Sequence, residues 1–341
     1  MKSINLLYTL HIAPSRPMPL TQIIPLRAYR HLLLPLLVLG ISAQAMGQGC
    51  SDAGVCTAGP IGEVTVHTDS STTAEPRHFA RLTFSYAIGE RSTTILQVVP
   101  EVSIGATERL SFQLKVPTIS VSGDLGSNSG LGDPVLTSSY QFIKKDHERL
   151  DGLVGVKLNS GDATALRDGR PLPMPYQTSL GTTDLLLGIS YKWKRFSGAL
   201  AYQHVLVQDN RNGFFRSAWA GSADSTAAAG YFASLLLERA NDAVVRAQYA
   251  VPVGKLILQP GLLAIMHLGE DTQLNTADLA QRVAITGSDG LTLNLTVDAR
   301  YKLSDSWAIE AAFGSPLVVR EVRPDGLTRA MVLNLGLRYS F

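Results

Sequence analysis

Long apolar runs are missing from this sequence. Of its 341 residues 45% are hydrophobic, yet no uninterrupted apolar stretch reaches the length of about 18 residues that a membrane-spanning helix needs. Acidic and basic residues are also scarce, at 17% of the chain against about a quarter in an ordinary soluble domain. If the chain crosses a membrane, it therefore crosses as β-strands.

The sequence also lacks an excess of either charge. It has 30 Lys and Arg against 28 Asp and Glu, a formal net charge of +2. A strongly basic surface for nucleic acid is therefore excluded. There are only two cysteines, and no cysteine or histidine pairs have the spacing of a metal site. We expect no nucleic-acid partner, no metal and no cofactor.

The N-terminal region carries an export signal. Residues Leu32 to Ile41 form an apolar stretch of ten residues after two arginines, which is the length of a signal-peptide core. The small-x-small pattern Ala43-Gln44-Ala45 follows, as at a signal-peptidase site. We therefore predict a signal peptide over 1–45. Translation could also start at Met18, which would shorten the long leader.

Cys50 and Cys56 lie just after this predicted cleavage site, in a segment over 46–77 that we expect in the periplasm, or inside the barrel described below as a plug. An oxidising compartment favours a disulfide between them. Lipidation of Cys50 is the alternative, although Gly47 stands where lipoprotein signals usually have a branched apolar residue.

From residue 78 onward, apolar and polar residues alternate along long segments. In 291–303, Leu291 and Leu295 fall on one face, and Asp298, Arg300 and Lys302 fall on the other. A slip of one residue would place basic side chains in the bilayer, at about 2 to 4 kcal/mol each near the midplane. Twelve such segments are predicted: 78–90, 93–105, 109–120, 133–143, 150–159, 181–193, 196–208, 240–251, 255–267, 290–303, 306–319 and 328–341.

The connections between these segments alternate in length. Short turns follow the even segments, and longer loops follow the odd ones from the third onward, which is typical of outer-membrane barrels. Segments of about 12 residues also exceed the strands of soluble sandwiches. We predict an all-β fold over 78–341: a transmembrane antiparallel up-and-down β-barrel of about 12 strands, or 14 if 209–239 hides a hairpin. The long loops are predicted at 121–132, 160–180, 209–239, 268–289 and 320–327.

The end of the chain resembles a known assembly signal. Tyr339 and Phe341 close an alternating segment, as in the C-terminal signal that the barrel assembly machinery recognises. The stretches Gly130 to Pro134 and Ser179 to Asp184 each open a strand, and they resemble the outer-membrane barrels grouped with the meta-pathway of phenol degradation. That resemblance implies passage of small molecules, including apolar or aromatic ones, but no set of binding residues.

Charged residues on the inward faces are the candidate lumen lining. Buried charges persist only when they are paired or hydrated. We expect either a network that fills a narrow lumen or a mildly cationic path for solutes. The inward candidates are Arg81, Glu101, Lys115, Lys157, Asp184, Arg246, Asp298, Arg300, Lys302, Glu310 and Arg338.

The predicted function follows from the size of the barrel. Twelve strands give a backbone diameter of roughly 24 Å, and about 10 to 14 Å after side chains are placed, which is too narrow for a general water channel. We predict passive, selective passage of small molecules across the outer membrane of a Gram-negative bacterium, with outer-membrane lipid, the assembly machinery and a small solute as partners.

Two other functions remain open. A structural or surface-interaction barrel with a closed lumen is the main alternative, and a barrel hydrolase or acyltransferase is the third. The histidines show no triad spacing with Ser and Asp, so we predict no enzyme activity. The histidines considered are His67, His78, His147, His204 and His267.

Overall fold

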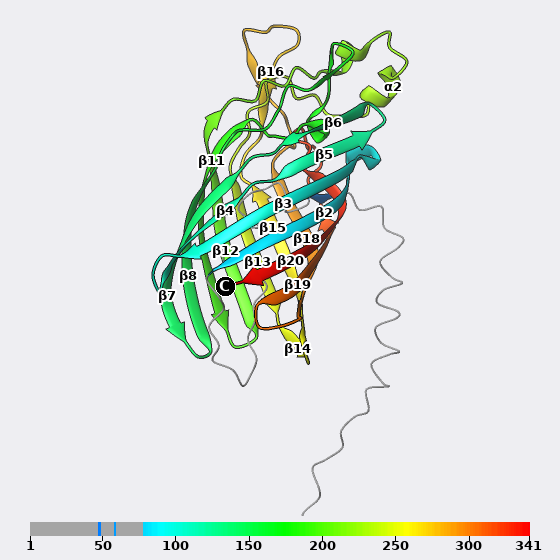
Figure 1. Ribbon diagram of the computed structural model, residues 1–341. Helices are drawn as coiled ribbons and strands as arrows, with labels where there is room; N and C mark the ends of the chain where they lie inside the picture. Colours follow the sequence, from blue (N-terminus) through cyan, green and yellow to red (C-terminus); the bar gives the residue numbers. More distant parts are fainter. Residues whose placement is uncertain (1–46, 49–57, 59–77) are drawn as a thin grey trace, which may run out of the picture. The chain divides into compact units, whose positions relative to one another are not determined.

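The computed structural model describes residues 47–48, 58 and 78–341. The predicted signal peptide, Cys50 and Cys56 lie outside these residues. Within them the chain forms a closed antiparallel β-barrel of 12 strands, which confirms the predicted fold class (Figure 1). The barrel closes because the first long strand pairs with the last, from Phe79 opposite Ser340 to Gly89 opposite Arg329.

Three of the 12 strands are each made of two consecutive segments. The strands are β2 (Phe79–Gly89), β3 (Thr94–Gly105), β4 (Leu110–Lys115) with β5 (Thr118–Gly123), β6 (Gly126–Leu131) with β7 (Val135–Lys145), β8 (Glu148–Lys157), β11 (Thr182–Trp193), β12 (Phe196–Gln208), β13 (Asp242–Tyr249) with β14 (Val251–Val253), β15 (Leu256–His267), β18 (Gly290–Lys302), β19 (Trp307–Val318) and β20 (Thr328–Ser340).

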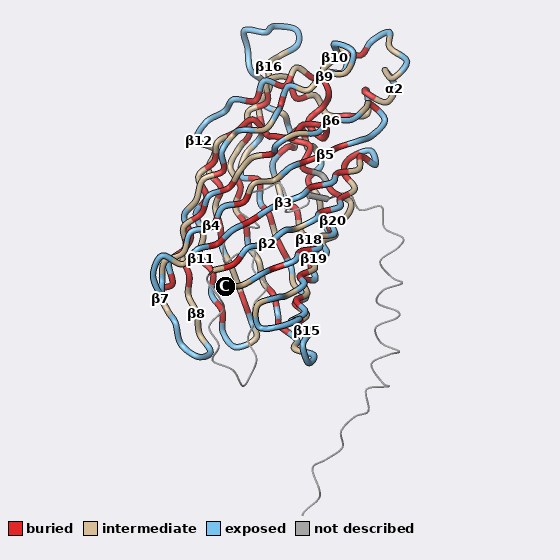
Figure 2. Tube along the Cα trace, viewed as in Figure 1, coloured by how far each residue is buried: buried red, intermediate tan, exposed pale blue. Residues whose placement is uncertain are grey.

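Burial alternates along these strands with the predicted period of two (Figure 2). On β18, Leu291 and Leu295 are 37% and 42% exposed, whereas Thr292 and Asp298 are buried. Apolar side chains therefore cover the outside of the barrel, and polar side chains face inward. In the described part of the chain, none of the helices combines the length and apolar character needed to cross a membrane.

Aromatic residues gather at the end of the barrel that carries the short turns. Trp307 and Tyr339 have ring centroids 4.8 Å apart, and the backbone N–H of Phe341 donates to the carbonyl of His78 over 3.1 Å. The two ends of the barrel sequence thus meet there. The role of Tyr339 and Phe341 as an assembly signal stays a prediction.

The loop predicted over 121–132 is wrong, because this segment continues the barrel wall. Residues of β5 and β6 pair from Thr118 opposite Leu131 to Gly123 opposite Gly126. The many Ser and Gly residues of this segment weaken the apolar alternation that predicts a strand. Val121 is buried, which shows that its side chain lies on the inward face. Gly126, with φ +126°, makes the tight turn possible.

The remaining long loops carry only short elements. Segment 209–239 contributes no barrel strand, so the alternative of 14 strands does not apply. The short elements in the loops are β9 (Leu166–Arg167), β10 (Arg170–Pro171), η5 (Met174–Tyr176), η6 (Arg216–Trp219), α2 (Ser225–Ala228), β16 (Thr272–Leu274) and β17 (Arg282–Ala284), and η4 (Glu90–Ser92) connects β2 to β3.

Candidate channel lumen

The barrel encloses a cavity of about 230 Å³. Its wall is built by inward-facing residues of the strands and by loop segments that enter the mouth. Arg81, Glu101 and Glu310 contribute charged groups, whereas Ile95 and Leu263 contribute apolar ones. The cavity therefore offers both polar and apolar surface to a small molecule.

Ion pairs link the charged groups of the lumen wall. The Arg81 guanidinium lies 2.6 Å from a carboxylate oxygen of Glu101 and 2.7 Å from one of Glu310. Glu310 also lies 2.7 Å from Arg300 and 3.8 Å from Arg338. Three arginines from three strands thus surround one carboxylate, which ties β2, β18 and β20 to β19.

Two further ion pairs lie at other positions of the wall. Lys157 Nζ is 2.7 Å from Asp184 Oδ2 and also donates a hydrogen bond to Thr182 Oγ1 over 3.0 Å. On the other side, Arg246 donates to Asp298. Lys157 and Asp184 lie on the paired strands β8 and β11, whereas Arg246 of β13 reaches across β15 to Asp298 of β18.

Most of the predicted lumen residues are brought together. Those that line the cavity are Arg81, Glu101, Lys115, Lys157, Arg246, Asp298 and Glu310. Asp184, Arg300 and Arg338 are buried in ion pairs with lining residues. Lys302 differs, because its side chain is 59% exposed at the turn end of β18, where it pairs with Asp305. At this end of the strand, a side chain in the inward register is exposed to solvent.

A buried loop segment crosses the mouth of the barrel. We call residues 172–181 the strap; every residue in it is buried. Asn210 Nδ2 donates to the carbonyl of Leu180 over 2.9 Å, and Ser179 Oγ donates to Asp133 over 2.9 Å. Opposite, a Cβ on Gly326 would lie 2.7 Å from the carbonyl carbon of Met174. The strap therefore touches the loop between β19 and β20 backbone to backbone.

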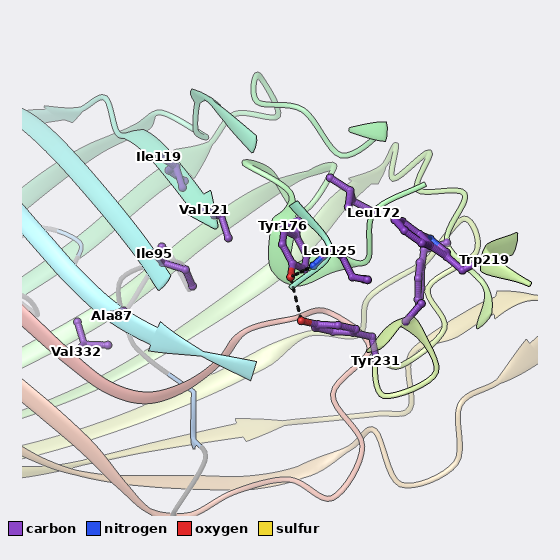
Figure 3. Close-up of a cluster of buried hydrophobic side chains, with 12 residues drawn as sticks. Ala87, Ile95, Ile119, Val121, Leu125, Leu172, Tyr176, Trp219, Tyr231 and Val332 are labelled. Carbon is purple, nitrogen blue, oxygen red and sulfur yellow. Dashed lines mark hydrogen bonds between the residues drawn. The ribbon is translucent and has the colours of Figure 1, made fainter. Parts of the chain in front are cut away.

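An apolar cluster holds the strap against the barrel wall (Figure 3). Tyr176 and Trp219 are buried in it with residues of β3 and β5. The hydroxyl groups of Tyr176 and Tyr231 are 3.0 Å apart, and the Tyr176 hydroxyl accepts the backbone N–H of Leu125. Burial raises the pKa of Tyr176, so this hydroxyl stays protonated and the anchor stays neutral.

A second, charged cluster at the mouth was not predicted. We call it the mouth network; it consists of Arg239, Asp242, His267, Asp271, Arg320 and Asp325. Arg239 lies 3.1 Å from Asp242 and 3.2 Å from Asp325, which is 2.7 Å from Arg320. These residues come from two strands and three loops, and their side chains are almost completely buried.

His267 is the centre of the mouth network. Its Nδ1 is 2.6 Å from Asp242 and its Nε2 is 2.8 Å from Asp271. The ring must carry both protons to donate both bonds. The network then contains three positive and three negative groups, and neither ring nitrogen is available to a serine as a base.

Two carboxyl groups near the mouth titrate abnormally. Burial alone would raise the pKa of Asp325, but Arg320 and Arg239 outweigh it and hold that pKa well below its usual range. The opposite holds in the turn between β2 and β3, where burial raises the pKa of Glu90 to about 7 despite the positive charge of Arg323. Glu90 therefore changes charge near neutral pH.

No protein-family model and no curated protein sequence matches this chain. It is similar to an outer membrane channel from Pseudomonas putida F1, with 18% identity over 82% of this chain and 100% of that chain and a TM-score of 0.54. A NanC porin has 9% identity over 77% and 100% of the two chains, with a TM-score of 0.45.

Outer membrane phospholipase A from Escherichia coli has 10% identity over 80% of this chain and 94% of that chain, with a TM-score of 0.37. The resemblance to barrels of phenol degradation stays a prediction. The similarity to the Pseudomonas putida channel concerns the fold, and it shows that this chain has the fold of an outer-membrane β-barrel.

Proposed function

We propose that the protein is an outer-membrane channel for the passive, selective passage of small molecules. One observation carries this proposal: a cavity lined by charged and apolar side chains lies inside a barrel whose outer face is apolar. A barrel that served only as a scaffold would gain stability from an interior packed at normal density. The predicted signal peptide and the C-terminal residues Tyr339 and Phe341 agree with export and assembly in that membrane.

The strap makes the proposed passage selective. Residues of the strap, from Met174 to Leu180, form part of the cavity lining, and the strap touches the segment around Gly326. A solute that enters from the loop end must therefore be small or must displace the strap. We expect a low conductance with brief openings, unlike that of a general porin.

Single-channel recording in planar bilayers tests this function. In a variant with Leu172→Ala and Tyr176→Ala, which removes two anchors of the strap from the apolar cluster, we expect openings several times more frequent than in the wild type. Leu166→Ala is the matched control, because Leu166 is an apolar residue of the same loop but is 61% exposed. If wild type and anchor variant are both silent, the lumen is closed and the protein is not a channel.

Hydrolase activity is tested separately. Esterase and phospholipase assays on the folded wild type should show no turnover above that of protein-free detergent micelles. Turnover clearly above this blank would favour the enzyme and contradict the channel as the main function.

A further inference from the structure

One hairpin extends beyond its neighbour at the end of the barrel that carries the short turns. β14 continues β13 and pairs with β15, with Val253 opposite Leu256 at the tip (Figure 1). On the other side, β12 stops earlier, because its first residue, Phe196, lies opposite Tyr249 of β13. Within the described residues, β14 therefore has a strand partner on one side only.

The turn between β11 and β12 lies next to the unpartnered side of β14. The carbonyl of Arg195 accepts the backbone N–H of Ala250 over 2.7 Å, and Ala250 is the residue that joins β13 to β14. This bond fixes the turn at the point where β14 begins. We call the surface formed by residues 193–196 and 249–255 the interfacial patch.

The outward side chains of the interfacial patch are aromatic or branched apolar. Trp193, Phe196 and Tyr249 are all exposed, and aromatic rings of this kind prefer the boundary between hydrocarbon and headgroups. Further along the same two strands, Leu200 pairs with Val245, and both are exposed on the outer face. The interfacial patch therefore continues without interruption into the apolar wall of the barrel.

Two lysines place positive charge in this apolar surrounding. Lys194 Nζ lies 5.1 Å from the ring centroid of Trp193, a cation–π contact that keeps the ammonium group beside an outward ring. Lys255 is exposed at the tip of the hairpin. In the part of the chain that the structure describes, neither ammonium group forms an ion pair.

The carboxylates of the two neighbouring turns have partners of their own. Glu148 lies 3.1 Å from Lys145 and accepts the hydroxyl group of Tyr191 over 3.0 Å. On the other side, Asp305 lies 2.7 Å from Lys302. The interfacial patch itself contains no Asp or Glu. It therefore combines uncompensated positive charge with an apolar outer surface.

Two other turns of the same end have a different charge pattern. Glu108 stands next to Arg109 in the turn between β3 and β4, and both are exposed. The turn between β7 and β8 contains Asp146 and Glu148 among its basic residues. The charge of the interfacial patch is therefore not a feature that every turn at this end shares.

We propose that the interfacial patch binds an anionic phospholipid from the leaflet at this end of the barrel, which is the periplasmic leaflet in the predicted orientation. Lys194 and Lys255 bind the phosphate, because basic side chains at a membrane surface attract anionic headgroups. The acyl chains lie along the aromatic rings and the apolar wall above them. A lipid matches this surface better than a soluble partner does, because the wall that continues from it faces hydrocarbon.

The proposal goes beyond the channel function and requires only that the barrel lies in a membrane. Lysine suits such a site, since its ammonium group is a compact charge on a flexible stem that can follow a mobile headgroup. The proline of β14, Pro252, agrees with an edge that no further strand extends, because proline is accepted at sheet edges.

Quenching of tryptophan fluorescence by brominated lipid tests the proposal. Trp219→Phe and Trp307→Phe leave Trp193 as the last of the three tryptophans of the chain, so the signal reports on the interfacial patch alone. The folded protein is placed in phosphatidylcholine vesicles that contain, at equal mole fractions, brominated phosphatidylglycerol or brominated phosphatidylcholine. The ratio of the two apparent association constants measures the preference for the anionic lipid.

We expect Trp193 to show a preference of about threefold for phosphatidylglycerol, which about 0.5 M KCl weakens. Lys194→Gln with Lys255→Gln should bring the ratio close to one. The matched control is Lys144→Gln with Lys145→Gln, because it removes the same amount of charge from exposed residues at the same end of the barrel. The control should leave the ratio unchanged.

Native mass spectrometry of the wild type, with its tryptophans intact, gives a second measurement. It should retain phosphatidylglycerol more often than Lys194→Gln with Lys255→Gln does. A wild-type ratio near one, a preference that survives this double substitution, or an equal loss in the control would each overturn the lipid site. The channel function is decided by conductance, so it can stand or fail independently of these results.

Discussion

Asp242 and His267 are joined across neighbouring strands at the mouth of the barrel, with 2.6 Å between Oδ1 and Nδ1. Asp242 begins β13 and His267 ends β15, so the bond connects two strand ends from which long loops leave. Asp271 holds the other ring nitrogen and accepts the backbone N–H of Ala240 over 3.0 Å. The imidazole thus holds the end of the loop before β13 and the start of the loop after β15 against the barrel wall.

Replacing this histidine should destabilise the barrel strongly. In His267→Ala two buried carboxylates lose their shared positive partner, and removing one member of a buried ionic cluster costs about 3 to 5 kcal/mol. Urea unfolding of the refolded protein in lipid vesicles measures the change. His147→Ala is the control, because His147 is exposed in a turn and should alter stability by less than about 0.5 kcal/mol. Equal effects of the two variants would contradict the buried network.

Glu90 should make stability depend on pH near neutrality. Its pKa is about 7 in the folded protein against 4.5 for a glutamate side chain in water, so the folded state binds the proton more tightly. Its stabilising contribution is then complete below about pH 4.5 and is lost as the pH rises through 7, by at most about 3 kcal/mol.

Glu90→Gln should remove this pH dependence while keeping the size of the side chain. The free energy of unfolding, measured from pH 5 to 8, should fall in the wild type and stay flatter in the variant. Glu108→Gln is the control, because Glu108 is exposed in a turn and should leave the wild-type slope unchanged. A Glu90→Gln variant with the wild-type slope would disprove the assignment.

Gly326→Ala should loosen the strap. Gly326 has φ +67° and meets Pro175, so an added methyl group must push strap and loop apart. Gly254→Ala is a close control, since its φ is +61° but nothing lies within 4 Å of the added carbon. Both variants carry a backbone penalty of about 1 kcal/mol, but only Gly326→Ala should increase the frequency of channel openings. Identical recordings would mean that the two segments do not control the mouth.

A basic side chain on the outer face should destabilise the barrel most where that face lies deepest in the bilayer. Leu295→Arg places a basic group on the apolar face of β18, which we expect to cost about 2 to 4 kcal/mol if the residue lies near the bilayer midplane. Leu279→Arg makes the same change in the loop between β16 and β17, where the side chain is 64% exposed, and should be nearly neutral. Unfolding in vesicles of defined thickness compares the two, and equal stability would argue against lipid contact at Leu295.

The sequence predicts the wall of this barrel well, because a strand exposed to two different environments must alternate. Leu295 and Asp298 lie on opposite sides for that reason alone, and the ion pairs of Arg81 follow once the inward faces meet. Lys302 is an exception, because alternation predicts which face of the strand a side chain lies on but not whether that side chain is buried. The hairpin at 121–132 is missed because Ser and Gly weaken the apolar signal while the backbone pairing persists.

The mouth could not be predicted in the same way. His267, Asp325 and Arg239 are far apart in the sequence and have no common period, so only the closed barrel brings them together. The strap is hidden for a similar reason, since its burial depends on loops from other strands.

The barrel is either closed or open, depending on whether β2 pairs with β20. Each of the two strands is an open edge until the other pairs with it. A chain shortened by that single strand would expose two rows of unsatisfied backbone groups at opposite ends of a curled sheet. Such a product would associate with its neighbours or be degraded, so the formation of one strand pair decides the fate of the whole barrel.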